Sequence, residues 1–216
     1  MNARSSTFVE TWHQRYRDVR AHTLALAEPL STEDQAVQSM PDASPAKWHQ
    51  AHTTWFFETL LLAPRMQGYR LFDPRYRYLF NSYYEALGPR HPRPQRGLLS
   101  RPDLAEVRAY RQHVDAAMLD FIHQADEEAL ALLELGLQHE QQHQELLLTD
   151  ILHAFSCNPL LPAYRESAPE SFAAQALHWL AHPGGVKQIG HDSAGFAFDN
   201  EMPRHRVLLP AFEIAD

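Results

Sequence analysis

Residues 130–155 read LALLELGLQHEQQHQELLLTDILHAF, and this stretch decides the fold class. It contains no proline, and its leucines recur at helical spacing, so it predicts one long amphipathic helix. The helix is expected to begin near Asp126 and to continue to about Ser156. Gly136 is its only interruption, and a glycine inside a helix costs about 1 kcal/mol relative to alanine.

Three further helices are expected before this one. Residues 7–26 lack glycine and proline, and their apolar side chains return every three to four positions. A second helix is expected up to Pro64, with Ser44 as its N-cap and Pro45 as its first residue. Ser100 and Pro102 are expected to open a third helix that runs through Phe121. Four amphipathic helices predict a mainly α chain with a four-helix bundle.

The segment between the second and third helices, residues 64–102, is rich in proline, glycine and aromatic residues. Long loops in compact domains are usually functional. This one carries Arg90, Arg93 and Arg96 at three-residue intervals in an otherwise acidic protein. Guanidinium groups bind carboxylates through paired, charge-assisted hydrogen bonds, so the loop is a candidate carboxylate clamp, with a solvated basic turn as the alternative.

Composition and charge exclude several classes of partner. The 216 residues include 19 Lys and Arg against 27 Asp and Glu, a net charge of −8, which disfavours nucleic acid. The longest apolar stretch, residues 55–64, contains Glu58 and is far shorter than a membrane span. A single cysteine, Cys157, and an amino terminus without an apolar signal core favour a cytoplasmic protein.

The sequence changes character after Cys157, where a turn-rich connector leads into short β-like runs. We expect a first domain over residues 1–160 and the incomplete start of a second domain over residues 170–216. About three strands are too few for an independent sheet domain. The expected strands are residues 186–189, 204–209 and 212–214.

Histidine is unusually frequent, with 14 residues. His139 and His143 are four apart, so both side chains lie on one face of the long helix and can reach a common ion. They continue a leucine stripe that should face the bundle interior, and His52 interrupts a similar aromatic stripe on the second helix. Three neutral imidazoles inside a bundle would hold a metal ion and leave coordination positions open.

The alternative to a metal site is that these histidines are ordinary core residues. A lone histidine on an apolar stripe is usually that, but two at ligand spacing with a third nearby favour a metal. His49 and His153 are left outside the ligand set, as supporting or structural residues. The remaining helical histidines are expected on the surface: His13, His22, His113 and His123.

The string HEQQH also fits the H-E-x-x-H pattern of zinc peptidases, with Glu140 as general base. The longer metzincin pattern fails, because Leu146 and Thr149 stand where it requires glycine and histidine. Glu166 remains a more distant third zinc ligand in this hypothesis.

Three segments together resemble the ergothioneine sulfoxide synthase family. They are SMPDASPAKWHQAHTTWFFET, FNSYYEALGPRHPRPQRGLLSRP and HEQQHQELLLTDIL. The resemblance implies a DinB-like four-helix bundle, and residues 201–216 resemble the opening of an α+β domain like that of formylglycine-generating enzymes, truncated at Asp216.

The resemblance also implies a function. Members of the family hold Fe(II) with three histidines, here His52, His139 and His143, and use O₂ to couple the thiol of γ-glutamylcysteine or cysteine to hercynine. Arg90 and Arg93 would bind carboxylates of the thiol substrate, and Gln142 would contact hercynine.

The family's catalytic tyrosine would lie beyond Asp216, so this chain alone is expected to be inactive. Three alternatives stay open: a selenoneine synthase on the same scaffold, a zinc-dependent DinB-type thiol transferase or zincin, and a non-catalytic metal-binding fragment.

Overall fold

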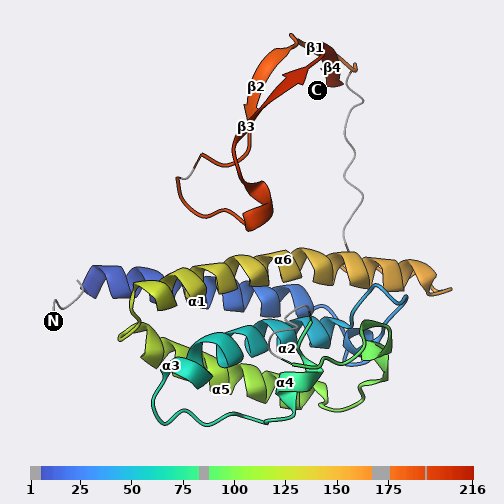
Figure 1. Ribbon diagram of the computed structural model, residues 1–216. Coiled ribbons are helices and arrows are strands. Elements are labelled where there is room, and N and C mark those ends of the chain that lie inside the picture. Colours follow the sequence, from blue (N-terminus) through green and yellow to red (C-terminus); the bar gives the residue numbers. More distant parts are fainter. Residues whose placement is uncertain (1–5, 83–87, 167–175, 193) are drawn as a thin grey trace. The chain divides into compact units, whose positions relative to one another are not determined.

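The computed structural model describes residues 6–82, 88–166, 176–192 and 194–216 (Figure 1). The chain divides into two compact units, Met1–Glu166 and Ser167–Asp216. The first is helical, and the described strands lie in the second. Within the described ranges, no helix is both long enough and apolar enough to cross a bilayer.

Four long helices build the first unit, as the sequence predicted. They are α1 (Ser6–Ala27), α2 (Ala46–Phe57), α5 (Leu104–Ile122) and α6 (Glu127–Cys157). A π-helical turn η2 (Glu58–Leu62) and the short α3 (Ala63–Arg65) prolong α2. The long loop that follows contains α4 (Tyr76–Leu79) and the 3-10 helix η4 (Arg93–Leu98), and another 3-10 turn, η1 (Asp34–Ala36), precedes α2.

Helix α2 is the centre of this unit. It packs against both α5 and α6, and α1 packs against α6 (Figure 1). All of its residues are buried, including polar side chains such as His49, Gln50 and Thr54. A helix that is buried all round is normally apolar, so the polar groups of α2 require partners inside the protein.

Two helix starts differ from the sequence prediction. Pro45 precedes α2 as its N-cap, and its carbonyl accepts the N–H groups of Trp48 at 2.8 Å and His49 at 3.2 Å. Ser44 does not cap the helix, because its N–H donates to Asp150 and its hydroxyl accepts from Arg96.

Helix α5 begins after Asp103 rather than at Ser100 or Pro102. The Asp103 side chain accepts the Glu106 N–H at 2.9 Å, and the Glu106 side chain accepts the Asp103 N–H at 2.8 Å. This reciprocal capping box satisfies two donors at the helix start, which fixes the start there.

The buried face of α6 is rotated by one residue from the predicted stripe. His139 and His143 are only half-buried, and Leu146 is exposed. Glu140 and Gln144, one position further along, are buried because they hydrogen-bond to α1. The histidines therefore lie at the border of the core. The buried residues of α6 are Ala129, Leu130, Leu133, Gly136, Leu137, Glu140, Gln144, Leu147, Asp150, Ile151 and Phe155.

Gly136 has a packing role that helix propensity alone did not indicate. A Cβ atom at this position would lie 2.5 Å from Cε1 of Phe57 and 2.8 Å from Cε1 of Phe56. The absence of a side chain lets two rings of α2 pack directly against the backbone of α6. The close approach of α2 and α6 brings their histidines within reach of each other.

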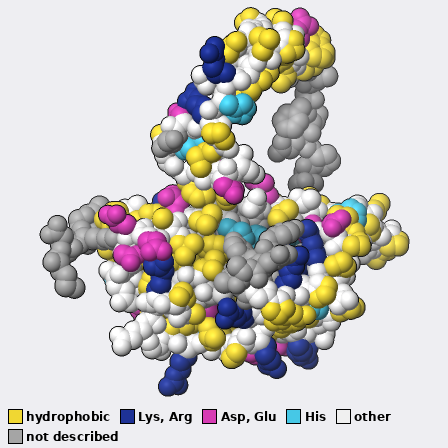
Figure 2. Space-filling model, in the orientation of Figure 1, with side chains coloured by type: hydrophobic (Ala, Val, Ile, Leu, Met, Phe, Trp, Pro, Cys, Tyr) yellow, Lys and Arg dark blue, Asp and Glu magenta, His cyan; other side chains and the backbone are white. Residues whose placement is uncertain are grey.

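The second unit contains two antiparallel ribbons. Strand β1 (Trp179–His182) pairs with β4 (Phe212–Ala215), and β2 (Gly185–Ile189) pairs with β3 (His205–Leu209). The sequence predicted three of these strands and missed β1. Many apolar side chains on the strands are exposed, including Trp179 at 60% and Leu208 at 75%, and Figure 2 shows hydrophobic groups over this unit. The assignment of this unit to a formylglycine-generating-enzyme fold stays a prediction.

Candidate metal centre

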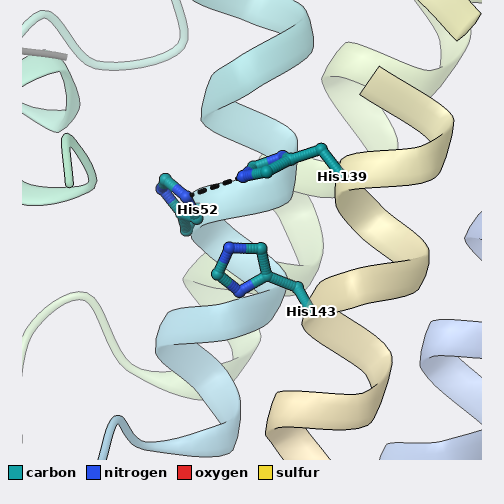
Figure 3. Close-up of side chains that lie close together, drawn as sticks. All are labelled: His52, His139 and His143. Carbon is teal, nitrogen blue, oxygen red and sulfur yellow. Dashed lines mark hydrogen bonds between the residues drawn. The ribbon is translucent and has the colours of Figure 1, made fainter. Parts of the chain in front are cut away.

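Helices α2 and α6 bring the three predicted histidines together. His52 comes from α2, and His139 and His143 come from successive turns of α6 (Figure 3). One ring nitrogen of each lies within 4.8 Å of the others. We call His52, His139 and His143 the histidine cluster. Among the described residues it is the only set of three or more His, Cys, Asp or Glu side chains that meets this criterion.

The proton on His52 is fixed by its surroundings. Its Nδ1 lies 2.6 Å from the carbonyl oxygen of Phe80, which accepts hydrogen bonds only, so Nδ1 carries the proton. The Nε2 lone pair then points to Nε2 of His139 at 3.2 Å. The ring stacks between Trp48 and Trp55, with centroid distances of 4.6 and 5.6 Å. These contacts leave His52 one orientation.

His143 is held from its other side. Its Nδ1 lies 2.9 Å from Nδ1 of His49, and Nε2 of His49 lies 3.0 Å from Oδ2 of Asp150. The sequence placed His49 outside the ligand set, and it lies outside the histidine cluster. Asp150 was missed. The signal for it was its spacing of seven residues, two helical turns, from His143.

Burial keeps the histidine cluster neutral. It lowers the pKa of His139 to about 4. Burial, and then the charge of the neighbouring His139, place the pKa of His52 well below 6.5. The pKa of His143 is lowered in the same way, by burial and then by His52. Neutral imidazole is the form that binds a metal ion.

The geometry of the cluster fits a divalent metal ion. Two nitrogens that each lie about 2.1 Å from one ion are about 3 Å or more apart, and the His52 and His139 Nε2 atoms are separated by 3.2 Å. Nδ1 of His139 is buried without a hydrogen-bond partner among the described residues. Three imidazoles leave further coordination positions open, the arrangement of a reactive rather than a structural site.

Glu140, next to His139, belongs to a different cluster. Its Oε2 accepts from Nη1 of Arg20 at 2.9 Å, and its Oε1 accepts from Oγ1 of Thr23 at 2.6 Å and from Nη2 of Arg111 at 3.1 Å. Burial alone would raise the pKa of this carboxyl, but the two guanidinium groups outweigh it and hold the pKa below its ordinary value. We call Arg20, Thr23, Arg111 and Glu140 the ion cluster.

The ion cluster argues against the zinc-peptidase hypothesis. A general base needs a free lone pair directed at the reacting water. Both oxygens of Glu140 are engaged by buried donors, and the side chain has no solvent exposure. Glu140 is therefore the counter-ion of two buried arginines.

The loop arginines have different surroundings. Arg96 is buried: its Nη1 donates to the Ser44 hydroxyl at 2.8 Å, and its guanidinium lies 3.4 Å from the centre of the Trp48 ring. Arg93 is half-buried, and its charge contributes to lowering the pKa of His49, after the larger effects of burial and of Arg96. Arg90 is exposed and donates to the Ser82 carbonyl. Residues 83–87 of this segment lie outside the described residues.

The other predicted positions are distributed along the bundle. Gln142 is exposed on α6. His13 is buried, contrary to the expectation of a surface residue, because its Nε2 hydrogen-bonds to the Leu119 carbonyl at 2.9 Å. His22 and His123 are exposed as expected, and His113 is half-buried.

Two curated proteins are similar to most of this chain. The chain is 32% identical over 203 residues to a hercynine oxygenase of Mycolicibacterium thermoresistibile, covering 91% of this chain and 43% of that protein. It is 30% identical over 201 residues to a hercynine oxygenase of Mycobacterium tuberculosis, covering 90% and 45%. The chain thus spans less than half the length of these curated relatives. Their similarity confirms the resemblance to the sulfoxide synthases.

The helical unit also matches a known family. Residues 15–147 match the DinB superfamily. The matched range includes parts of all four long helices and the whole histidine cluster. Because this range is more than half of the sequence, the chain belongs to the DinB superfamily.

Proposed function

We propose that this chain carries the metal site of an iron(II)- and O₂-dependent oxidoreductase, a sulfoxide synthase that acts on hercynine. The thiol substrate would be γ-glutamylcysteine or cysteine. The observation that carries the proposal is the histidine cluster, with three neutral imidazoles from two helices within reach of one ion. The similarity to two proteins named hercynine oxygenase supports the substrate and the reaction class.

The chain's own residues would perform three tasks at this site. His52, His139 and His143 would hold the ion, and Fe(II) would supply the redox chemistry with O₂. Trp48 and Trp55 cover the two faces of His52 and exclude water from the α2 side. The carbonyl of Phe80 keeps the lone pair of His52 directed into the cluster.

Metal binding tests the proposal directly. Protein purified without oxygen and reconstituted with Fe(II) should bind about one equivalent per chain. His52→Ala, His139→Ala and His143→Ala should each abolish tight binding, because each removes one of three ligands. His22→Ala, an exposed histidine on α1, is the control and should bind normally. Full Fe(II) affinity in His52→Ala would contradict the three-histidine site.

We further propose that Arg90 and Arg93 bind carboxylates of the thiol substrate and that Gln142 contacts hercynine. Arg93 is half-buried and, like Arg96 but less strongly, contributes to lowering the pKa of His49, which supports its place near the site. A cationic side chain there would attract an anionic substrate toward the metal.

Substrate binding to the Fe(II) protein tests the arginines. Arg93→Leu and Arg90→Leu should weaken binding of γ-glutamylcysteine by about 2 to 5 kcal/mol where the partner carboxylate stays buried, and should affect hercynine far less. Arg101→Leu, an exposed arginine later in the same loop, is the control. Calorimetry with each substrate measures the effect, and unchanged thiol affinity in both variants would favour a solvated basic turn.

Two observations would redirect the proposal. A selenium donor in place of the thiol would indicate a selenoneine synthase on the same scaffold. Selective retention of zinc, without redox turnover, would indicate a DinB-type thiol transferase or a non-catalytic metal-binding protein. Metal analysis of the purified protein and mass spectrometry of the product separate these outcomes.

A further inference from the structure

His143 is connected to a buried acid through a second histidine. Nδ1 of His143 lies 2.9 Å from Nδ1 of His49, and Nε2 of His49 lies 3.0 Å from Oδ2 of Asp150. His49 is 3% exposed and Asp150 is 8% exposed. The chain of contacts runs from α6 to α2 and back to α6.

The direction of each hydrogen bond follows from its end point. Oδ2 of Asp150 also accepts the Ser44 N–H at 2.8 Å, and a carboxylate offers no proton, so Nε2 of His49 donates to it. A neutral imidazole carries one N–H, so Nδ1 of His49 has a lone pair and accepts. His143 must then donate from Nδ1. This leaves the lone pair of His143 on Nε2.

The same contacts fix the position of the ring. Asp150 is seven residues after His143 on α6, so the two lie on one face of the helix, two turns apart. Through the Ser44 N–H and His49, the carboxylate also ties this face to the first turns of α2. Rotation of the His143 ring, or a shift of one helix along the other, would break one of these hydrogen bonds.

We propose that His49 and Asp150 are a positioning pair that holds His143 in its Nδ1–H tautomer, with Nε2 free as a metal ligand. Such partners orient a ligating histidine and increase its basicity, and their loss typically lowers metal affinity about 10- to 100-fold. The inference rests on the proposed metal site. The pair does for His143 what the Phe80 carbonyl does for His52.

Two measurements on the full chain test the pair. Nitrogen-15 NMR of the imidazole groups in the metal-free protein reports which nitrogen of His143 carries the proton. Titration with Co(II) alone, followed by its visible absorption, reports metal affinity. The wild-type protein should show the Nδ1–H form of His143 and tight Co(II) binding.

Three variants should separate positioning from packing. His49→Phe keeps a buried ring but removes the acceptor, so His143 should gain the Nε2–H form and Co(II) affinity should fall about 10- to 100-fold. His49→Asn restores a short acceptor and should recover much of both signals. Asp150→Ala should change both in the same direction as His49→Phe, with a smaller loss because His49 remains.

The control is His13→Phe, which also replaces a buried, hydrogen-bonded histidine, in α1, and should leave both signals unchanged. A folded His49→Phe with wild-type tautomer and affinity would overturn the pair. If His49→Phe does not fold, the other two variants decide. The proposal is overturned if His49→Asn loses both the Nδ1–H form of His143 and tight Co(II) binding while Asp150→Ala keeps both. Failure of the wild-type protein to bind Co(II) would count against the metal site alone, because the NMR measurement still decides the tautomer.

Discussion

His139 and Glu140 are adjacent in the sequence, yet they belong to two polar clusters with opposite properties. In the ion cluster, both carboxylate oxygens of Glu140 accept hydrogen bonds from buried donors. In the histidine cluster, the Nε2 atoms of His52 and His139 face each other at 3.2 Å, and Nδ1 of His139 has no hydrogen-bond partner among the described residues. The carboxylate of the ion cluster is satisfied by the protein itself, whereas the facing Nε2 atoms of the histidine cluster would, in the proposed function, hold an ion.

The comparison of the two clusters indicates which buried polar groups stabilise the fold and which are available to bind a ligand. Buried polar atoms in native proteins are nearly always paired, so an unpaired one needs an explanation. The ion cluster links α1, α5 and α6 through Arg20, Arg111 and Glu140. The histidine cluster links only α2 and α6. Removing a member of the first should therefore affect stability, and removing a member of the second should affect metal binding.

The largest expected effect is on Glu140. Glu140→Gln should lower the free energy of unfolding by about 3 to 5 kcal/mol, because it removes the carboxylate that two buried guanidinium groups share. Arg20 keeps its 2.7 Å contact with Asp115, so the loss falls mainly on Arg111. Denaturant unfolding of the metal-free protein, with circular dichroism as the signal, measures the change.

Helix α6 provides a matched control for this prediction. Glu134 also pairs with an arginine of α1, and its contact with Arg15 has the same 2.9 Å length as that of Glu140 with Arg20, but both partners are partly exposed. Exposed ion pairs contribute about 0 to 1 kcal/mol, so Glu134→Gln should be nearly neutral. Equal losses of stability in the two variants would show that burial does not distinguish the Glu140 ion pair from the Glu134 ion pair.

The fold was largely predictable because the four long helices have clear apolar periodicity. The residues at which the helices start were less predictable. Ser44 is a good capping residue by type, but its groups are used by Asp150 and Arg96, which a local pattern does not reveal. The leucine stripe predicts a face of α6 that is one residue away from the buried one, because Glu140 and Gln144 are buried against polar groups of α1.

The spacing of His139 and His143 predicts that they share one face of a helix, and the aromatic stripe of the second helix predicts that His52 faces them. Neither pattern reveals the partners of those residues. Asp150 shares a helix face with His143 but reaches it only through His49 of α2, and the Phe80 carbonyl lies in the loop, so packing brings both to the site. Gly136 is a further position whose role the sequence alone did not reveal, because the need for a glycine there depends on two rings from another helix.

A smaller expected effect is the dependence of stability on pH, which differs between the two clusters. Burial places the pKa of His52 and His143 well below 6.5 and that of His139 at about 4. As the pH falls below about 6.5, the unfolded chain takes up protons that the folded chain does not, so stability decreases toward pH 4. The Glu140 carboxyl, whose pKa is held below 4.5, contributes a loss only at lower pH.

Unfolding of the metal-free protein between pH 7.5 and 5, with a chelator present, therefore reports the histidine cluster together with its neighbour His49, whose pKa burial also lowers. Each fully buried histidine contributes at most about 1.4 kcal/mol per pH unit, and the half-buried ones contribute less because solvent screens them. His52→Phe keeps a flat ring between Trp48 and Trp55. It should reduce the slope of stability against pH by most of the amount that corresponds to uptake of one proton. Glu140→Gln should lower stability throughout this range without changing the slope. An unchanged slope in His52→Phe would mean that His52 is as easily protonated in the folded chain as in the unfolded one. The histidine cluster would then not have the neutral His52 that a metal ion requires.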